Sequence, residues 1–458
     1  MMVLVIWLTV LVVAFTLYLK EKYSKFKRKG VNGPKPIPII GTGWTVYLGK
    51  EHMADYLIRM YQSFPNERFY GNFELLKPLV VVRDIDLIKQ ITTKDFEYFL
   101  DHRSMVEPDI DPLFGRNLVT LKGQEWKDMR SMLSPMFTSS KIRVMVPFMM
   151  EVGNQMIESL KKKIKESNEN FIDVDSKDLT SRYTNDVIAS CAFGLKVNSM
   201  VDEDNEFFKM GKIVTNFTPW MLLKVFFYLN MPVIMRILKI KFLPEAASNF
   251  FRGIIMGTME DREKNNIFRP DMIHLMMQAR KGRLEHEEKS NSDQDTGFAT
   301  VEESVVETKT IKKESLRLWT PAVILDRICT KDYNLGKPND LATQDYIIRK
   351  GEGVTLAAWA IHRDPKYFPN PTKFDPERFS EENKHKIVPF SYMPFGLGPR
   401  NCIASRFALC ELKVMLYQLL LHFEISPCEK TCVPSQLDPT RFTLCLKGGS
   451  WIRIKIRE

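Results

Sequence analysis

The sequence predicts a mainly α-helical protein with small β-sheets, held behind one N-terminal transmembrane helix. Three observations support this fold class: an uncharged apolar run at residues 1–19, long stretches with helical spacing of apolar residues, and β-branched runs that are short. The chain has 458 residues, of which 44% are hydrophobic and 27% charged. This balance is typical of a globular protein and excludes a disordered tail, a collagen or a disulfide miniprotein.

The first element is a membrane anchor. Residues 1–19 carry no charge, and a helix of that length reaches about 28 Å, which spans a bilayer. Basic residues dominate positions 20–29, so the positive-inside rule places the following chain in the cytosol. A cleaved signal peptide is the alternative, but the basic cluster follows the apolar run and no small-x-small cleavage site is visible. We expect a transmembrane anchor at 1–19 and a basic, proline-rich spacer at 20–41.

The next elements belong to one soluble domain at residues 42–458. An apolar run at 79–82 predicts a strand, and a helical period begins at Ile85. Residues 141–167 keep one apolar face and end in lysines, which predicts a long packed helix that starts near Pro147. Residues 216–242 are apolar but interrupted by two prolines, which suits either core or a surface that dips into lipid.

The chain then changes character twice. Residues 281–313 mix acidic residues with Lys, Ser and Thr, which predicts an exposed and flexible segment. Beyond it, Pro, Gly, aromatic and Arg residues are dense up to Pro399, and a long apolar helix follows at 403–422. We expect the chemistry to lie at that transition.

Net charge and cysteine content limit which binding partners and which redox compartment we expect. The net charge of +10 favours an anionic membrane or an acidic partner, but it is too diffuse to predict binding to nucleic acid. The seven cysteines are odd in number, and five of them lie in the last fifth of the chain, which favours a reducing compartment over a disulfide framework. A zinc site at Cys428, Cys432 and His422 is a remote alternative, because the spacing of these residues is irregular.

The strongest motif is the octapeptide at residues 395–402, which contains Phe395, Gly398, Arg400 and Cys402. It ends at the mouth of the predicted helix, where the positive helix end and the arginine lower the pKa of a cysteine. A thiolate in that position is a good iron ligand. A buried structural cysteine is the alternative.

The octapeptide resembles the haem-ligand loop of cytochrome P-450, Phe-x-x-Gly-x-Arg-x-Cys-x-Gly, with Ala404 in place of the last glycine. Glu314 and Arg317 match the Glu-x-x-Arg motif of this family, and their spacing places them on one helix face. The resemblance implies that Arg378, from the motif at 374–379, completes a Glu-Arg-Arg cluster. A surface salt bridge is the alternative for any one of these pairs.

Trp126 and Arg130 resemble the family's Trp-x-x-x-Arg motif, in which both side chains bind a haem propionate. Arg400 is a second propionate partner by the same resemblance, and Arg327 a third. The planar fork of an arginine matches a carboxylate. For a Trp and an Arg on one helix, packing and solvent exposure are the alternative.

The resemblance, which is to insect microsomal members of the xenobiotic-metabolising type, implies a P-450 fold containing haem b (iron protoporphyrin IX). Cys402 is then the axial ligand of the haem iron, and its thiolate favours O–O cleavage. The implied activity is monooxygenation of small lipophilic molecules with O2 and electrons from NADPH, delivered by an NADPH-dependent cytochrome P-450 reductase. The implied location is the endoplasmic reticulum membrane, with the catalytic domain on the cytosolic side.

One family feature is missing from the sequence. A long distal helix normally carries Ala/Gly-Gly-x-Asp/Glu-Thr, which supplies protons for oxygen activation, and the nearest string here, Asp295-Thr296, lies among polar residues. Val306 is followed within a few residues by the Glu314 motif, so we expect an incomplete fold with this helix deleted at 281–313. A large apolar surface is then exposed.

The origin of this deletion is open at the level of sequence. The chain can be a splice form, an incomplete gene model or a degenerate copy, or another segment can cover the haem. The alternative function is therefore a non-catalytic haem-binding or misfolded variant that lacks the proton-delivery helix.

Overall fold

The computed structural model describes residues 2–103, 106, 108–215, 219–281 and 306–457. The chain forms two compact units, each built from two separate stretches. The first unit combines Met1–Arg103 with Glu302–Cys402, and the second combines Ser104–Val301 with Ile403–Glu458. Helices predominate, and the sheets have four, three and two strands among the described residues, as the predicted fold class requires.

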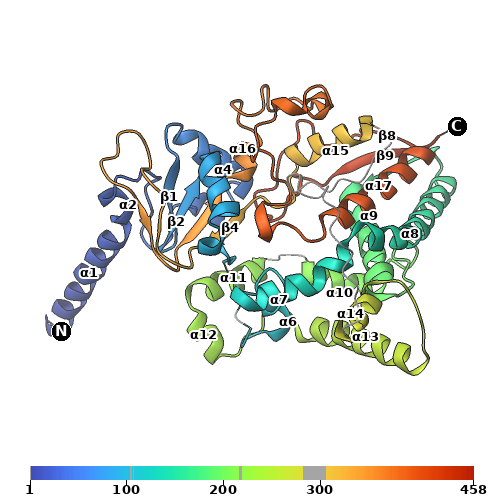
Figure 1. Ribbon diagram of the computed structural model, residues 1–458, viewed down its shortest axis with the longest axis horizontal. Helices are drawn as coiled ribbons and strands as arrows, with labels where there is room; N and C mark the ends of the chain where they lie inside the picture. Colours follow the sequence, from blue (N-terminus) through green and yellow to red (C-terminus); the bar gives the residue numbers. More distant parts are fainter. Residues whose placement is uncertain (1, 104–105, 107, 216–218, 282–305, 458) are drawn as a thin grey trace. The chain divides into compact units, whose positions relative to one another are not determined.

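The N-terminal helix α1 (Met2–Tyr23) begins the first unit and extends away from its sheet (Figure 1). It is the one helix in the described ranges that is long and apolar enough to cross a membrane, with a mean hydropathy of 2.6 over its most apolar window. The predicted spacer follows as the short helix α2 (Lys25–Arg28) and then as non-helical chain through its three prolines.

The first unit is built on the sheet β1-β2-β7-β4. Strands β1 (Phe69–Glu74) and β2 (Lys77–Val82) form an antiparallel hairpin, β7 (Gly353–Leu356) runs parallel to β2, and β4 (Leu325–Ile328) is antiparallel to β7. The apolar run that predicted a strand at 79–82 is therefore the buried part of β2. The other elements of this unit are α3 (Trp44–Tyr47), α4 (Met53–Ser63), α5 (Ile85–Lys89), the π-helical turn η1 (Gln90–Lys94), α15 (Val306–Leu318), β5 (Tyr333–Asn334), β6 (Ile347–Ile348) and α16 (Ala358–Ile361).

The second unit is a helical assembly closed by the sheet β3-β9-β8. The long helix α8 (Ser139–Glu166) packs along α17 (Ser405–His422), which lies beside it in Figure 1, and also against α9 (Ser176–Ile188). Their apolar faces form one core cluster. Its other α-helices and strands are β3 (Phe171–Asp175), α6 (Pro112–Gly115), α7 (Gly123–Leu133), α10 (Glu206–Thr215), α11 (Pro219–Asn230), α12 (Pro232–Ile237), α13 (Glu245–Lys264), α14 (Met272–Arg280), β8 (Phe423–Ser426) and β9 (Trp451–Ile456).

The structure corrects two boundary predictions. The long helix α8 begins at Ser139, so Pro147 lies inside the helix and not near its start. Of the predicted flexible segment at 281–313, residues 306–313 are helical and form the first turns of α15, whereas 282–305 lie outside the described residues together with Asp295 and Thr296. Pro219 and Pro232 each stand at the first position of a helix, where the missing N–H of proline costs nothing.

Candidate functional site

The octapeptide at residues 395–402, named here the cysteine loop, turns back on itself. The N–H of Cys402 donates to the carbonyl of Phe395 at 2.8 Å, which closes the loop at its base. Gly396 and Gly398 have φ angles of 78° and 67°, a region that side chains with a Cβ rarely adopt. Cys402 is exposed at the end of the loop, and α17 begins three residues later at Ser405.

Gly398 has a second role, because it lets the cysteine loop approach η1. A Cβ atom added at Gly398 would lie 1.8 Å from the backbone oxygen of Thr92. No side chain can occupy that space without moving the backbone. The glycine in the motif is therefore required by contact as well as by its φ angle.

Arg400, in the cysteine loop, is buried and already engaged within the first unit. Its Nε donates to the carbonyl of Leu100 at 2.6 Å, and its Nη2 lies 3.2 Å from the carboxylate of Asp101. The side chain is 3% exposed. These contacts fix the loop to the chain segment that precedes Arg103.

Arg327, on β4, is the buried cation beside the cysteine loop. It is 3% exposed, and it donates to the carbonyls of Asp326 at 2.6 Å and Leu397 at 3.3 Å. Burial lowers the pKa of its guanidinium to about 10. The ion pairs between described residues include no carboxylate for Arg327, and the carboxylate of Asp326 contacts His102 and the N–H of Arg103 instead.

A buried guanidinium without a carboxylate is costly unless an anion joins it. A haem propionate supplies an anion of the right geometry. The exposed thiol of Cys402 and the buried cation of Arg327 therefore fit a haem bound next to the cysteine loop. Arg400 fits less directly, because Asp101 already provides it with a carboxylate.

The predicted Glu-Arg-Arg cluster lies together in the first unit. Arg317 binds Glu314 through two parallel hydrogen bonds of 2.8 and 2.7 Å, and both side chains are fully buried. Arg378 Nε lies 3.5 Å from the same carboxylate. The N–H of Asp375 also donates to Glu314 at 3.0 Å, so the carboxylate is held from three directions. This is a buried network and not a surface salt bridge.

Sequence reasoning missed two members of this region, Thr320 and His362. Both are fully buried, and the hydroxyl of Thr320 lies 2.8 Å from Nδ1 of His362. His362 Nε2 accepts the N–H of Met393 at 2.9 Å, and its carbonyl accepts from Arg317 at 2.5 Å. No short motif connects the two residues, because they lie 42 positions apart in the sequence.

Trp126 and Arg130 lie on α7 in the second unit. Trp126 is 4% exposed and Arg130 is half-buried. Their i, i+4 spacing places them on the same face of α7, as the sequence predicts. The propionate role of this pair stays a prediction.

The zinc alternative is wrong on the described geometry. Among the described residues, which include Cys428, Cys432 and His422, no group of three or more His, Cys, Asp and Glu side chains can hold a metal ion. Cys428 instead contacts the hydroxyl of Thr431 at 3.6 Å, and Cys432 contacts the carbonyl of Pro434 at 3.4 Å.

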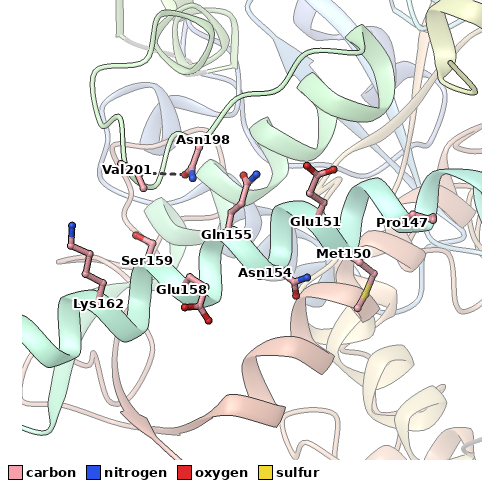
Figure 2. Close-up of a pocket in the computed structure, with 10 residues that line it drawn as sticks. All are labelled: Pro147, Met150, Glu151, Asn154, Gln155, Glu158, Ser159, Lys162, Asn198 and Val201. Atoms are coloured by element: carbon pink, nitrogen blue, oxygen red, sulfur yellow. Dashed lines mark hydrogen bonds between the residues drawn. The ribbon is translucent and has the colours of Figure 1, made fainter. Parts of the chain in front are cut away.

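A groove of about 790 Å³ runs along α8 in the second unit. Figure 2 shows side chains from successive turns of α8, with Asn198 and Val201 of the loop between α9 and α10 on one side. Val201 N–H donates to the side chain of Asn198 at 3.3 Å, which holds that loop. None of the predicted site residues lines this groove, so it is not the predicted haem site.

Comparison with known proteins gives consistent matches. A family model described as cytochrome P450 matches residues 31–307 and 306–452. Cytochrome P450 9e2 of Blattella germanica is 38% identical in an alignment of 504 positions, gaps included, which covers 94% of this chain and 94% of that protein. Probable cytochrome P450 9f2 of Drosophila melanogaster is 38% identical in an alignment of 497 positions, which covers 94% of this chain and 95% of that protein. Cytochrome P450 6j1 of Blattella germanica is 31% identical in an alignment of 497 positions.

The family match is interrupted at one place. Its two segments meet at residues 306–307, inside the stretch where the sequence predicts a deleted helix. The alignment with cytochrome P450 9e2 extends over 504 positions, whereas this whole chain has 458 residues, so the relative holds residues without a counterpart here. These two findings support the predicted loss of a segment.

Proposed function

The chain belongs to the cytochrome P450 family, and its relatives are insect haem monooxygenases; from this premise we propose that it is a membrane-anchored haem-thiolate monooxygenase. It oxidises lipophilic small molecules with O2 and with electrons from NADPH that a cytochrome P450 reductase delivers. The observation that carries the proposal is the cysteine loop, closed at its base and placed beside the buried cation of Arg327, which forms no ion pair with another described residue.

Each residue has a distinct part in this proposal. A bound haem would supply the activation of O2, and Cys402 would hold its iron through a thiolate. Arg327 would neutralise a propionate, and the resemblance adds Arg400, Trp126 and Arg130 as further hydrogen-bond donors to the propionates. Phe395 and Gly398 shape the loop, and the Glu314 cluster braces the stretch that leads to it.

The membrane part of the proposal rests on the first residues of the chain. Helix α1 is long and apolar enough to span, and the basic residues that follow it favour the cytosolic side of the endoplasmic reticulum membrane. A soluble domain held at that face meets substrates that partition into lipid and a reductase in the same membrane.

The experiment is turnover by the full chain, supplied with haem and reconstituted with a cytochrome P450 reductase in phospholipid nanodiscs. The proposal predicts an oxygenated product from a lipophilic alkoxycoumarin probe that depends on NADPH and on the reductase. Cys402→Ser is the matched control and should abolish this product. Haem bound by the wild-type chain without any product would contradict the proposal, and would favour a non-catalytic haem-binding chain that lacks the distal helix.

A further inference from the structure

His362 stands between the Glu314 cluster and the cysteine loop. It follows α16 directly and is fully buried, with Phe368 and Tyr392 as aromatic neighbours at ring-centre distances of 6.2 and 5.6 Å. Its backbone carbonyl accepts from Arg317 at 2.5 Å. This hydrogen bond anchors the backbone of His362 to Arg317 on α15.

The hydrogen bonds of His362 define one tautomer. Nε2 faces the N–H of Met393, which can only donate, so Nε2 must be the unprotonated acceptor. Nδ1 then carries the proton and donates to the hydroxyl of Thr320, whose own proton goes to the carbonyl of Leu316 at 2.7 Å. In this series of three hydrogen bonds, every donor therefore has an acceptor. Burial lowers the pKa of His362 to about 3, which keeps the ring neutral.

Met393 connects this network to the cysteine. Its carbonyl accepts the N–H of Gly396 at 3.1 Å, and the carbonyl of Phe395 accepts the N–H of Cys402 at 2.8 Å. The position of Met393 therefore sets where the cysteine loop begins. Hydrogen bonds at Met393, Gly396 and Phe395 therefore link the ring of His362 to the backbone of the loop that ends at Cys402.

We propose that His362, oriented by Thr320, is a positioning residue for the loop that carries Cys402. The pair ties the end of α15 to Met393 and so fixes the loop before any haem binds. This inference rests on the proposed function only in its spectroscopic part, where Cys402 is the haem ligand. It does not make His362 a catalytic residue, because the ring contacts neither Cys402 nor a substrate.

The test compares Thr320→Val with Thr320→Ser, since Val keeps the volume of threonine but removes the hydroxyl, and Ser restores it. The first readout is hydrogen–deuterium exchange in the peptide that contains Met393 and Gly396, measured on the full chain without haem. We expect roughly fivefold faster exchange, or more, in Thr320→Val, because a buried donor on His362 is left unpaired. Thr320→Ser should exchange like the wild type, and peptides from α8 should exchange equally in all three chains.

The second readout is the carbon monoxide difference spectrum of the haem-loaded chains. Thr320→Val should raise the blue-shifted share of the band, which reports a displaced thiolate, and Thr320→Ser should restore the wild-type spectrum. His362→Gln, which keeps an acceptor for Met393, should fall between the wild type and His362→Leu in both readouts.

The outcomes separate the two claims. Equal exchange in Thr320→Val, Thr320→Ser and the wild type would overturn the positioning role, whatever the spectra show. Faster exchange in Thr320→Val alone, in a chain whose wild type gives no thiolate band, would support the positioning role and overturn the haem-thiolate function instead.

Discussion

At the scale of single residues, Gly398 is the most constrained position in the cysteine loop. Its φ of 67° and the 1.8 Å approach of a Cβ to Thr92 leave two independent reasons for glycine. Gly351 offers a matched control in the same unit, because it has a φ of 89° and nothing within 4 Å of a Cβ. Comparing alanine substitutions at the two glycines separates the cost of backbone strain from the cost of the contact with Thr92.

We predict that Gly351→Ala lowers the free energy of unfolding by about 1–2 kcal/mol, the cost of a side chain in the left-handed region. Gly398→Ala should cost a further 1–3 kcal/mol or so, because the loop must move away from η1. Urea unfolding of the solubilised chains measures both values, and haem content should fall in Gly398→Ala alone. Equal losses in the two variants would show that the contact with Thr92 has no energetic weight.

His362 predicts a pH dependence of stability. Its pKa is about 3 in the folded chain and near 6.5 when unfolded, because burial and the charges of Arg363 and Arg317 oppose protonation. Between these values the unfolded chain binds a proton that the folded chain does not, so stability falls as the pH drops below about 6.5. The slope from this one group is about 1.4 kcal/mol per pH unit.

We expect His362→Gln to lose this slope, since glutamine has no ionisable group. Urea unfolding of the wild type and the variant at pH values from 7 to 5 measures the difference directly. The gap in stability between the two chains should shrink as the pH falls. A gap that stays constant would contradict a neutral His362 in the folded chain.

The candidate role of a residue could be predicted from the sequence where the residue belongs to a short motif. Cys402, Gly398, Glu314 and Arg317 stand in patterns whose spacing is local, so their roles follow from short stretches. His362 could not be found in this way, because its partners Thr320 and Met393 are far from it along the chain and meet it only in the fold.

At the scale of elements, α15 is attached through its buried carboxylate. Glu314 neutralises Arg317 directly and lies 3.5 Å from Arg378, and it is fully buried. Removal of one partner from a buried ionic network leaves uncompensated charges in a medium of low dielectric constant. Glu314 and Arg317 together attach α15 to the segment at 371–378, because Arg317 also donates to the carbonyl of Pro371 at 2.8 Å.

We predict that Glu314→Gln lowers the free energy of unfolding by about 3–5 kcal/mol. Arg349→Gln is the control, because its ion pair with Asp332 is exposed, and it should cost about 0–1 kcal/mol. Urea unfolding at pH 7 compares them. A loss below about 1 kcal/mol in Glu314→Gln would show that the cluster does not hold α15.

Helices and strands with a regular pattern of apolar residues could be predicted from the sequence, whereas a helix that continues through a proline could not. The strand at 79–82 and the helix at 403–422 were both visible as patterns of apolar residues. The position of Pro147 inside α8 was not, because packing of α8 along α17 sustains the helix past a residue that lacks an N–H donor. Tertiary contact decides such cases.

At the scale of the whole molecule, the second unit carries an apolar stripe on α17. Leu412, Leu416 and Leu420 follow each other at i, i+4 spacing and are 40%, 47% and 48% exposed. These three side chains form an exposed apolar stripe among the described residues. Contiguous apolar patches of this kind promote association.

We predict that the solubilised chain self-associates through this stripe. The double variant Leu416→Glu, Leu420→Glu should raise the monomer fraction in size-exclusion chromatography without lowering the urea midpoint, since neither side chain is buried. The same double change at buried Met415 and Leu419 should instead destabilise the unit. An unchanged monomer fraction in the exposed variant would contradict the prediction.

The sequence indicates that the distal helix is deleted, but single motifs do not predict how this deletion affects haem binding. The interrupted family match at 306–307 agrees with the absence of the distal motif. Whether a haem is held without that helix depends on contacts spread over the whole chain, which no local pattern encodes.

The central claim is that Cys402 binds the haem iron as a thiolate in this chain. The most direct test is the carbon monoxide difference spectrum of the full chain in membranes, supplied with haem and reduced with dithionite, beside Cys402→Ser. The account predicts a red-shifted Soret band of the thiolate type in the wild type that is lost in Cys402→Ser. No band in the wild type, or the blue-shifted type in both chains, would contradict it.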